Sequence, residues 1–470
     1  MKKTTFALFF GNRGFFPASL IAGAREDMRR ELNALGHEVL MLEESATRYG
    51  AVETVQEGEI YANFLRANRG KFGGVILCLP NFGDENGAVT ALQEAGVPIW
   101  IQAYPDDYEL MGPATRRDSF CGKLSIMDVF RQYGVKFTVF KPHTVRPGSE
   151  RFRQNVDAFD RVCQVVNGVK GMVVGAIGAR TTPFKTVRID EVALQRRGVT
   201  VETFDMSDVF HRMRAVKAAD AAYNAKAALL RGMTTWNGVP DNAFDNLVRL
   251  GVTLDQMIAE ANLDAVAIRC WTEIQMQMGI SPCVAMGALN ELGTAAACEV
   301  DLGNAVAMRA MHLASYQPVG LLDWNNNYYD EDDKCILFHC GPLPASLMEG
   351  GSRVTDHAIL MSSVGEGNAY GCNQGRIRPM DFTFSSLMTD EGRVKLYLGE
   401  GRFTSDPIPA NFFGVAGVAE IPNLQDVLLH IGKQGHRHHV SVTPGRLIQP
   451  LAEALGYYLE FDVAVPQSNP

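Results

Sequence analysis

The stretch that decides the fold is Gly74-Val75-Ile76-Leu77-Cys78-Leu79, an unbroken apolar run. Such a run lacks the alternation of a strand that faces water on one side, and it is typical of a parallel strand covered on both faces. The sequence around it alternates short apolar runs with segments of helical periodicity. This rhythm predicts a parallel sheet between layers of helices.

The N-terminal third repeats this pattern of strand and helix. We expect strands over residues 4–10, 38–42, 74–79 and 97–101, and helices over residues 18–35 and 55–68. Ligands of parallel sheets gather at the carboxyl ends of the strands. The loops over residues 11–17, 80–87 and 103–111 follow predicted strands, so we expect them at that edge.

A second alternating block begins near Met172. It predicts strands over residues 172–178, 201–204 and 265–269 and a long helix over residues 209–230. After Asp330, short strands are expected over residues 334–339, 358–361, 381–385 and 394–398, before helices near residues 423–431 and 445–455. Short strands among frequent glycines and prolines are typical of an antiparallel domain or barrel. The sequence therefore predicts an α/β protein with two doubly wound α/β domains, 1–167 and 168–328, followed by a β-rich, barrel-like domain, 329–470.

The composition is that of an ordinary globular protein, with 46% hydrophobic and 21% charged residues. A net charge of −9 leaves no basic footprint for nucleic acid. No apolar run is long enough to cross a bilayer, and the run over residues 6–10 predicts a strand rather than a signal peptide. Nine scattered cysteines without a C-x-x-C motif indicate reduced thiols and a cytoplasmic protein.

Two carboxylates follow the small apolar residues 293–297 almost directly. Glu299 and Asp301 therefore enter a poorly solvated place, where a charge must be paired or bound to a metal. Asp301 can instead cap a helix expected over residues 305–313. Glu299 is a candidate metal ligand.

Asp323 ends a short apolar strand, and three asparagines follow after Trp324. The Asp323 carboxylate offers a hard oxygen ligand. The amide of Asn325 can donate to a sugar hydroxyl or hold the carboxylate in place. The alternative is a turn, which aspartate and asparagine form readily.

Histidines occur at two places of interest. His339 ends an apolar strand, where a histidine is either a hydrogen-bonded core residue or a ligand. His438 and His439 belong to a group of three histidines over residues 436–439, which could instead form a surface patch. Because adjacent strand residues point to opposite faces, only one of the pair is the expected ligand.

Two carboxylates with one or two histidines make a mixed oxygen and nitrogen site. Carboxylates favour hard ions such as Mn²⁺ or Mg²⁺, and imidazole admits transition metals such as Co²⁺, so Mn²⁺ is the expected ion. Structural zinc is not expected, because cysteine clusters are missing from the sequence.

The sequence resembles the L-fucose isomerase and L-arabinose isomerase superfamily. The stretches over residues 298–301, 322–327, 335–340 and 438–440 carry this resemblance. It implies Mn²⁺ held by Glu299, Asp323 and His439, with His339 as the further ligand of the arabinose isomerase branch. It also implies a homo-oligomer built from trimers, commonly a hexamer.

The resemblance further implies residues that bind the sugar. Arg13 looks like the family's substrate arginine, which would reach the site of a neighbouring subunit. Ser119 and Lys123 belong to a stretch that looks like a family loop at the subunit junction. His438 is expected on the substrate side of the ion or beside its ligands.

The implied reaction is aldose–ketose isomerisation of an open-chain sugar such as L-fucose, D-arabinose or L-arabinose through an enediolate. Glu299 and Asp323 would act as general base and acid. A modified hexose such as sulfoquinovose is an alternative substrate, and its sulfonate would need arginine or lysine near C6. The candidates for that contact are Arg13, Lys123, Arg180, Lys185 and Arg376. The alternative functions are a sugar-binding protein without catalysis and a metal-dependent aldolase.

Overall fold

Two parallel sheets and one large mixed sheet form the protein. The computed structural model describes residues 2–468. By their contacts these residues divide into two compact units. Unit 1 comprises the chain up to Asn167 together with Glu453–Leu459, and unit 2 comprises Gly168–Ala452 and the residues from Glu460 onward.

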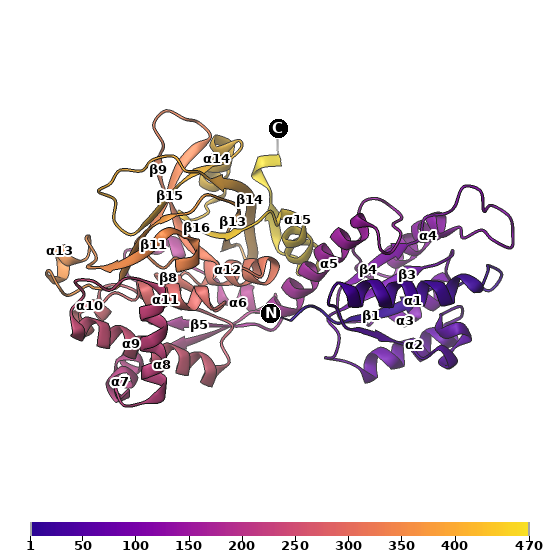
Figure 1. Ribbon diagram of the computed structural model, residues 1–470, viewed down its shortest axis with the longest axis horizontal. Coiled ribbons are helices and arrows are strands. Elements are labelled where there is room, and N and C mark those ends of the chain that lie inside the picture. The colour runs from indigo at the N-terminus through magenta and orange to yellow at the C-terminus, as the bar shows by residue number, and fades with distance from the viewer. Residues whose placement is uncertain (1, 469–470) are drawn as a thin grey trace. The chain divides into compact units, whose positions relative to one another are not determined.

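Unit 1 contains a four-stranded parallel sheet in the order β2-β1-β3-β4. Figure 1 labels β1, β3 and β4 of this sheet. Its strands are β1 (Phe6–Phe10), β2 (Val39–Met41), β3 (Gly74–Leu79) and β4 (Ile99–Ala103). Its helices are α1 (Ser19–Ala34), α2 (Val55–Ala67), α3 (Glu85–Leu92), α4 (Ser119–Gln132) and α5 (Glu150–Val169). The apolar strand predicted over residues 74–79 is β3, and all six of its residues are buried.

Alternate residues of β1 and β3 enter two different apolar clusters, one on each face of the sheet. Phe9 and Leu77 pack with side chains of α2, α3 and α4. Phe10 and Ile76 pack with side chains of α1 and α5. Because both faces are covered, these strands need no polar alternation, which explains their unbroken apolar sequence.

Unit 2 begins with a second parallel sheet in the order β6-β5-β7-β8. The strands are β5 (Val173–Ile177), β6 (Thr200–Phe204), β7 (Ala265–Ile268) and β8 (Ala295–Cys298). The helices are α6 (Glu191–Gln195), α7 (Met206–Ala215), α8 (Ala221–Met233), α9 (Asp241–Ala261), α10 (Glu273–Met278), α11 (Cys283–Glu291) and α12 (Leu302–Ser315). The chain after β5, β7 and β8 therefore leaves the same edge of the sheet, where ligands of such folds bind.

The C-terminal part of unit 2 forms a mixed sheet in the order β11-β12-β15-β10-β9-β16-β13-β14-β17. Its strands are β9 (Gly320–Asn327), β10 (Lys334–His339), β11 (Met348–Thr355), β12 (Cys372–Ile377), β13 (Met380–Asp390), β14 (Arg393–Phe403), β15 (Val415–Glu420), β16 (His439–Pro444) and β17 (Asp462–Ala464). Its helices are α13 (Met361–Val364), α14 (Leu424–Gln434) and α15 (Ile448–Leu451). Because β14 also pairs with β15, the strands from β15 through β14 close into the barrel that the sequence predicts.

Helix α12 packs against the barrel strands β13 and β16. Close approach is possible because residue 303 is glycine. A Cβ atom at Gly303 would lie 2.3 Å from the backbone oxygen of Leu387 in β13. This packing brings the end of β8, which leads into α12, beside the barrel strand that carries His439.

Three details of the secondary structure differ from the sequence prediction. The helix predicted over residues 209–230 is interrupted between α7 and α8, because Asp220 accepts a hydrogen bond from the backbone N–H of Lys217 and forms a turn instead. The strand predicted over residues 358–361 is a turn that leads into α13, since His357 Nδ1 accepts from the N–H of Leu360. Asp323 does not end its strand, because β9 continues to Asn327.

The division of residues 168–470 into a middle and a C-terminal domain stays a prediction. Over residues 2–468, no helix is both long enough and apolar enough to span a bilayer.

Candidate metal centre

Glu299 lies in a sharp turn between β8 and α12. Glu299 and Val300 have φ angles of 61° and 59°, in the left-handed region. This conformation costs a non-glycine residue about 1–2 kcal/mol. Hydrogen bonds from Val300 to Ile268 and from Asp301 to Cys298 hold the turn. Backbone strain of this kind persists where surrounding contacts enforce it, often at functional sites.

Three neighbouring barrel strands bring the other predicted ligands to the same place. His439 is the first residue of β16 and stands directly opposite Asp323 in β9. On the other side of β9, Asp323 stands opposite Phe338 in β10, one residue before His339. The antiparallel register therefore gathers Asp323, His339 and His439, which are far apart in sequence.

Four side-chain atoms converge within this cluster. His439 Nε2 lies 2.8 Å from Glu299 Oε2 and 3.6 Å from Asp323 Oδ1. His339 Nε2 lies 3.9 Å from Glu299 Oε2. All four atoms are buried, and none has a hydrogen-bond partner of suitable geometry among the described residues. Buried polar atoms are normally satisfied, so this convergence indicates a site built for an ion or a polar ligand.

Asp301 fixes the orientation of His439. The Nδ1–H of His439 donates to Asp301 Oδ2 at 2.8 Å, so the lone pair of a neutral ring is on Nε2 and faces the cluster. Asp301 also pairs with Arg437, and it accepts from the backbone N–H and the side-chain amide of Asn304. Asp301, Arg437 and Asn304 are all buried.

His339 has the opposite hydrogen-bonding pattern. Its Nδ1 accepts from the backbone N–H of Cys340 at 2.8 Å. A neutral His339 therefore carries its hydrogen on Nε2, and that N–H points toward Glu299. The two histidines are chemically distinct, because His439 offers a lone pair to the cluster and His339 offers a hydrogen-bond donor.

The carboxylates of the cluster differ in their pKa. Burial opposes ionisation of Glu299, but the contact with His439 outweighs it and lowers the pKa of the Glu299 carboxyl. Burial raises the pKa of Asp323. Burial lowers the pKa of His439, but Asp301 and Glu299 together raise it to about 9. When neighbouring carboxyl groups differ in pKa, the group with the lower pKa is suited to act as a base and the group with the higher pKa as an acid.

A cavity of about 220 Å³ opens onto this cluster. Glu299, Asp323 and His339 line it on one side. The remaining wall is largely apolar and includes Trp271, Phe338, Ile359, Leu360 and Phe413. The Trp271 Nε1–H donates to Glu299 Oε1 at 3.1 Å and leaves Oε2 facing the histidines.

The predicted substrate residues of unit 2 lie at different places. The side chain of His438 is 44% exposed, and its Nε2 lies 3.7 Å from Asp323 Oδ1. Asn325 is exposed and lines another hollow, with Trp324 and Tyr329. A β-bulge pairs Ile336 with Asn326 and Leu337 with Trp324, so it leaves Asn325 without a partner in β10.

The predicted substrate residues Arg13, Ser119 and Lys123 belong to unit 1. The Arg13 guanidinium pairs with Glu85 and lies 4.1 Å from the centre of the Phe82 ring. Ser119 is buried and donates to the backbone oxygen of Tyr104. Lys123 is buried and donates to the backbone oxygen of His143 at 2.6 Å, and burial lowers its pKa to about 8.

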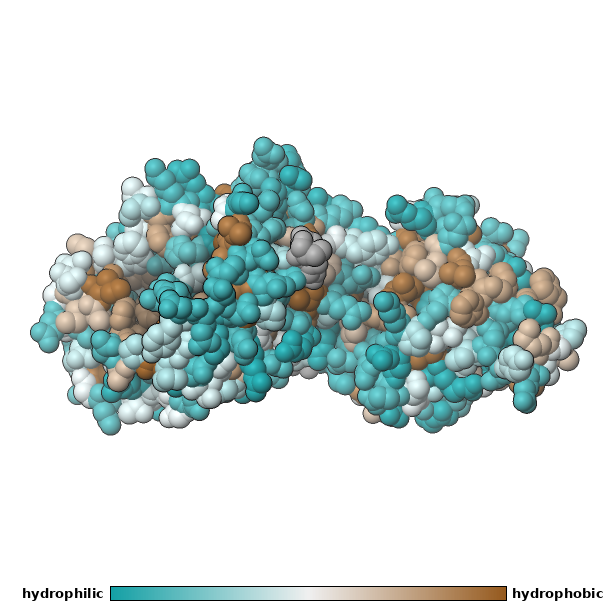
Figure 2. Space-filling model, turned by 90° about the horizontal axis from the view of Figure 1, so that it is seen from above, coloured by the Kyte–Doolittle hydropathy of each residue, from teal (hydrophilic) through white to brown (hydrophobic). Residues whose placement is uncertain are grey.

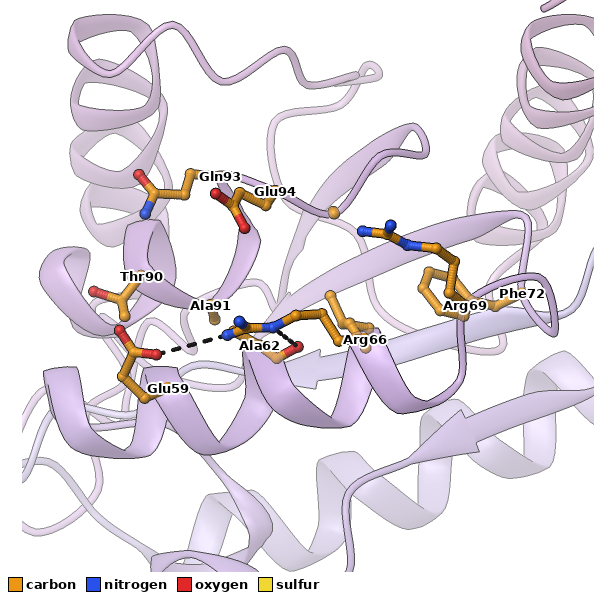
Figure 3. A pocket seen from close by; sticks show the side chains of 11 residues that line it. Glu59, Ala62, Arg66, Arg69, Phe72, Thr90, Ala91, Gln93 and Glu94 are labelled. Atoms are coloured by element: carbon orange, nitrogen blue, oxygen red, sulfur yellow. Dashed lines mark hydrogen bonds and ion pairs between the residues drawn. The ribbon is translucent and has the colours of Figure 1, made fainter. Parts of the chain in front are cut away.

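A separate hollow in unit 1 lies beside α2 and α3 (Figure 3). Its charged side chains, Glu59, Arg66, Arg69 and Glu94, are exposed, and Arg66 lies 3.7 Å from Glu59. Its lining, all within the described chain, includes no histidine or cysteine. This hollow therefore lacks the convergent buried groups of the cluster in unit 2.

Sequence reasoning missed Arg437 and Trp271, and it found only one of the two roles of Asp301. Asp301 is a helix cap, as considered, but its second oxygen also holds His439. Arg437 lies between His436 and His438. An arginine at this position in a histidine-rich stretch could have indicated a carboxylate partner nearby. Trp271 follows β7 at the ligand-binding edge of the sheet, the position that could have singled it out.

Comparison with known proteins gives matches to both ends of the chain. The family "Fucose/sulfoquinovose isomerase, N-terminal domain" matches residues 7–170, and "L-fucose isomerase, C-terminal domain" matches residues 337–466. The sulfoquinovose isomerase of Priestia aryabhattai is 22% identical over 420 residues, which cover 88% of this chain and 90% of that protein. The sulfoquinovose isomerase of Alkalicoccus urumqiensis is 22% identical over 377 residues, which cover 79% and 81%.

Replacing Arg437 with methionine should destabilise unit 2. The buried Asp301 would lose its permanent counter-ion, and breaking a buried pair costs roughly 3–5 kcal/mol. Chemical denaturation in the presence of chelator measures this change. The control is Arg446→Met, which removes an exposed pair with Asp381 and should cost less than about 1 kcal/mol. Equal losses in the two variants would contradict the structural role of Arg437.

Proposed function

Because the chain belongs to the fucose isomerase family and is a sugar ketol isomerase, we propose that it isomerises sulfoquinovose with a divalent ion held by Glu299, Asp323 and His439. The proposal rests on the convergence of buried atoms from these three residues that make no hydrogen bond of suitable geometry, although His439 Nε2 lies 2.8 Å from Glu299 Oε2.

The comparisons favour the sulfonated sugar over the neutral sugars. The relatives from Priestia aryabhattai, Priestia megaterium and Alkalicoccus urumqiensis are all named sulfoquinovose isomerase. L-Fucose, D-arabinose and L-arabinose, the first expectation from the sequence, therefore become the less supported substrates. The choice of sulfoquinovose as substrate rests on the activity for which these relatives are named.

The donor set fits a divalent ion. The cluster and its neighbours hold three carboxylates, those of Glu299, Asp301 and Asp323. Among the described residues that contact them there, Arg437 is the one permanently charged cation. A divalent ion would offset this excess of negative charge. Two carboxylate oxygens and one imidazole nitrogen suit Mn²⁺, with Mg²⁺ or Co²⁺ as substitutes. His339 is not included as a ligand, because its Nε2 carries the hydrogen.

The proposed chemistry assigns one role to each side chain. The ion, when bound, polarises the carbonyl and stabilises the negative charge of the enediolate. Glu299, whose pKa is lowered, removes the proton from C2 as the general base. Asp323, whose pKa is raised, delivers a proton as the general acid. Trp271 holds one oxygen of Glu299, and the Nε2–H of His339 donates to a substrate oxygen.

A sulfonate needs a cation that the cavity lining lacks. Arg180 and Lys185 lie on the loop between β5 and α6, at the ligand-binding edge of the sheet. Thr181 of this loop donates to the backbone oxygen of Trp271, and the Phe184 ring lies 5.5 Å from that of His438. The loop thus reaches the mouth of the cluster, and we assign the sulfonate contact to Arg180 with Lys185.

The other candidate cations have internal partners. Arg13 pairs with Glu85, Lys123 donates to a backbone oxygen, and Arg376 donates to the backbone oxygen of Asp406 at 2.6 Å. Recruiting any of them would require breaking these contacts. Arg180 also donates to backbone oxygens, but these belong to Thr181 and Thr182 of its own loop and do not tie it to another element. This comparison favours Arg180 and Lys185.

Assembly into a homo-oligomer built from trimers is part of the proposal. Large apolar side chains are exposed on unit 1, including Phe15, Leu110, Met111, Phe120 and Leu124. Figure 2 shows hydrophobic residues gathered on the surface of this unit. Surfaces of this kind often mark protein interfaces, and sedimentation of a monomer at micromolar concentration would contradict this part.

Dialysis against chelator should abolish ketose formation from sulfoquinovose, and Mn²⁺ should restore it. The matched variant Glu299→Gln keeps the shape of the side chain but removes the base. It should lower kcat by at least about 100-fold and suppress exchange of the C2 hydrogen with solvent deuterium. Full turnover without any divalent ion would refute the metal role. Undiminished C2 exchange in the variant would refute the base.

Arg180→Gln should separate sulfoquinovose from neutral aldoses. Loss of a charge-assisted contact should raise KM for sulfoquinovose by about 10-fold or more, with kcat and the activity on a neutral aldose nearly unchanged. Arg188→Gln, an exposed change farther along the same loop, is the matched control. Steady-state kinetics on both sugars checks this expectation. An equal effect on both substrates would count against a sulfonate contact.

A further inference from the structure

Four free cysteines lie next to the candidate metal centre and have no role in the proposed reaction. Cys298 is the last residue of β8, and Cys340 directly follows β10. Cys270 lies two residues after β7, and Cys283 begins α11. We call these four residues the thiol cluster. Cys340 is half-buried, and the other three are buried.

The thiol cluster is closely spaced around one side of His339. His339 Nδ1 lies 3.2 Å from Cys340 Sγ, and Cys283 Sγ lies 3.6 Å from Cys340 Sγ. Donor atoms of Cys298, His339 and Cys340 all lie within 4.8 Å of one another. Cys270, Cys283 and Cys340 also line the cavity, so an ion that enters it can reach the thiols.

We propose that Cys298, Cys340 and His339 form a second metal site, which binds a thiophilic ion such as Zn²⁺ or Cd²⁺. Cys283 lies within reach of Cys340 as a possible fourth donor. The site is distinct from the cluster of Glu299, Asp323 and His439, because its donors are soft sulfur atoms rather than hard oxygens.

The donor spacing suits a tetrahedral ion. Zinc binds sulfur at about 2.3 Å and nitrogen at about 2.0–2.1 Å, so donors on one ion stand roughly 3.4–3.8 Å apart. The separations of 3.2 Å between His339 Nδ1 and Cys340 Sγ and of 3.6 Å between Cys283 Sγ and Cys340 Sγ are close to these values. Cys298 offers its sulfur within 4.8 Å of the donors of His339 and Cys340. When the ion binds, the thiols lose their protons to solvent. His339 Nδ1 gives up the hydrogen bond that it accepts from the Cys340 N–H and binds the ion instead.

His339 connects the two sites through its two ring nitrogens. Nδ1 faces Cys340, whereas Nε2 faces Glu299. The two ions therefore need no common donor atom, and both sites can be filled at once. This inference does not depend on which sugar the enzyme isomerises.

Titration of the Mn²⁺-loaded full-length protein with Cd²⁺ tests the second site. We expect one Cd²⁺ per chain, an ultraviolet thiolate-to-cadmium charge-transfer band, and an unchanged manganese content by elemental analysis. Cys298→Ser and Cys340→Ser should each weaken cadmium binding by at least about 10-fold, as expected for loss of groups that support a bound metal. The control is Cys163→Ser, a buried thiol of unit 1 that should leave the band intact.

Two results would overturn the proposal. One is release of Mn²⁺ on adding Cd²⁺ without a charge-transfer band, which would place cadmium on the oxygen ligands. The other is cadmium binding by both serine variants as in the unchanged protein. If a variant does not fold, X-ray absorption at the cadmium edge of the unchanged protein decides. Two or more sulfur neighbours support the site, and a shell of oxygen and nitrogen alone refutes it. Neither outcome depends on turnover of sulfoquinovose.

Discussion

The pairing of Asp301 with Arg437 and His439 joins the parallel sheet of unit 2 to its barrel. Asp301 caps α12 just after the end of the parallel sheet, whereas His439 begins the barrel strand β16 and Arg437 lies two residues before it. The carboxylate of Asp301 is fully buried, so each of its contacts is made in a place of low polarity, where an unpaired charge would be costly. The same contacts that dock the sheet onto the barrel also set the tautomer and direction of His439. Stability and function therefore share one network.

The fold brings negatively charged carboxylates together in unit 2 and leaves them with few positively charged partners. Glu299 directly follows β8, Asp323 lies in the middle of β9, and both line the same cavity. Arg437 is already engaged by Asp301, and Trp271 holds only one oxygen of Glu299. In the proposed function, the inward-facing atoms bind a divalent ion and the open-chain sugar. Their apolar surroundings strengthen every electrostatic interaction made there.

Much of this arrangement could be read from the sequence, because local patterns determine it. The unbroken apolar run of β3 indicated a strand buried on both faces, and the small residues before Glu299 indicated that this carboxylate enters a poorly solvated place. The placement of Asp323 was only partly predictable. Its aspartate and asparagines suggested the end of a strand, whereas pairing with β10 and β16 extends β9 through them. The roles of Asp301 and Arg437 depend on contacts between residues more than 100 positions apart, which no local pattern reports.

The thiol cluster is a second feature that local sequence patterns did not predict. In the sequence they are scattered and give no metal-binding spacing, so a zinc site was not expected. In the fold, the ends of β7, β8 and β10 and the start of α11 bring four of them together. Parallel sheets collect residues from distant strand ends at one edge. Spacing along the chain is therefore a poor guide to sites built in this way.

The central claim is that one divalent ion is held by Glu299, Asp323 and His439. Anomalous X-ray scattering at the manganese edge, from crystals grown with Mn²⁺, tests it most directly. We expect a single strong peak within bonding distance of Glu299 Oε2, Asp323 Oδ1 and His439 Nε2. A peak on the thiols instead, or no peak in this cluster at saturating Mn²⁺, would contradict it.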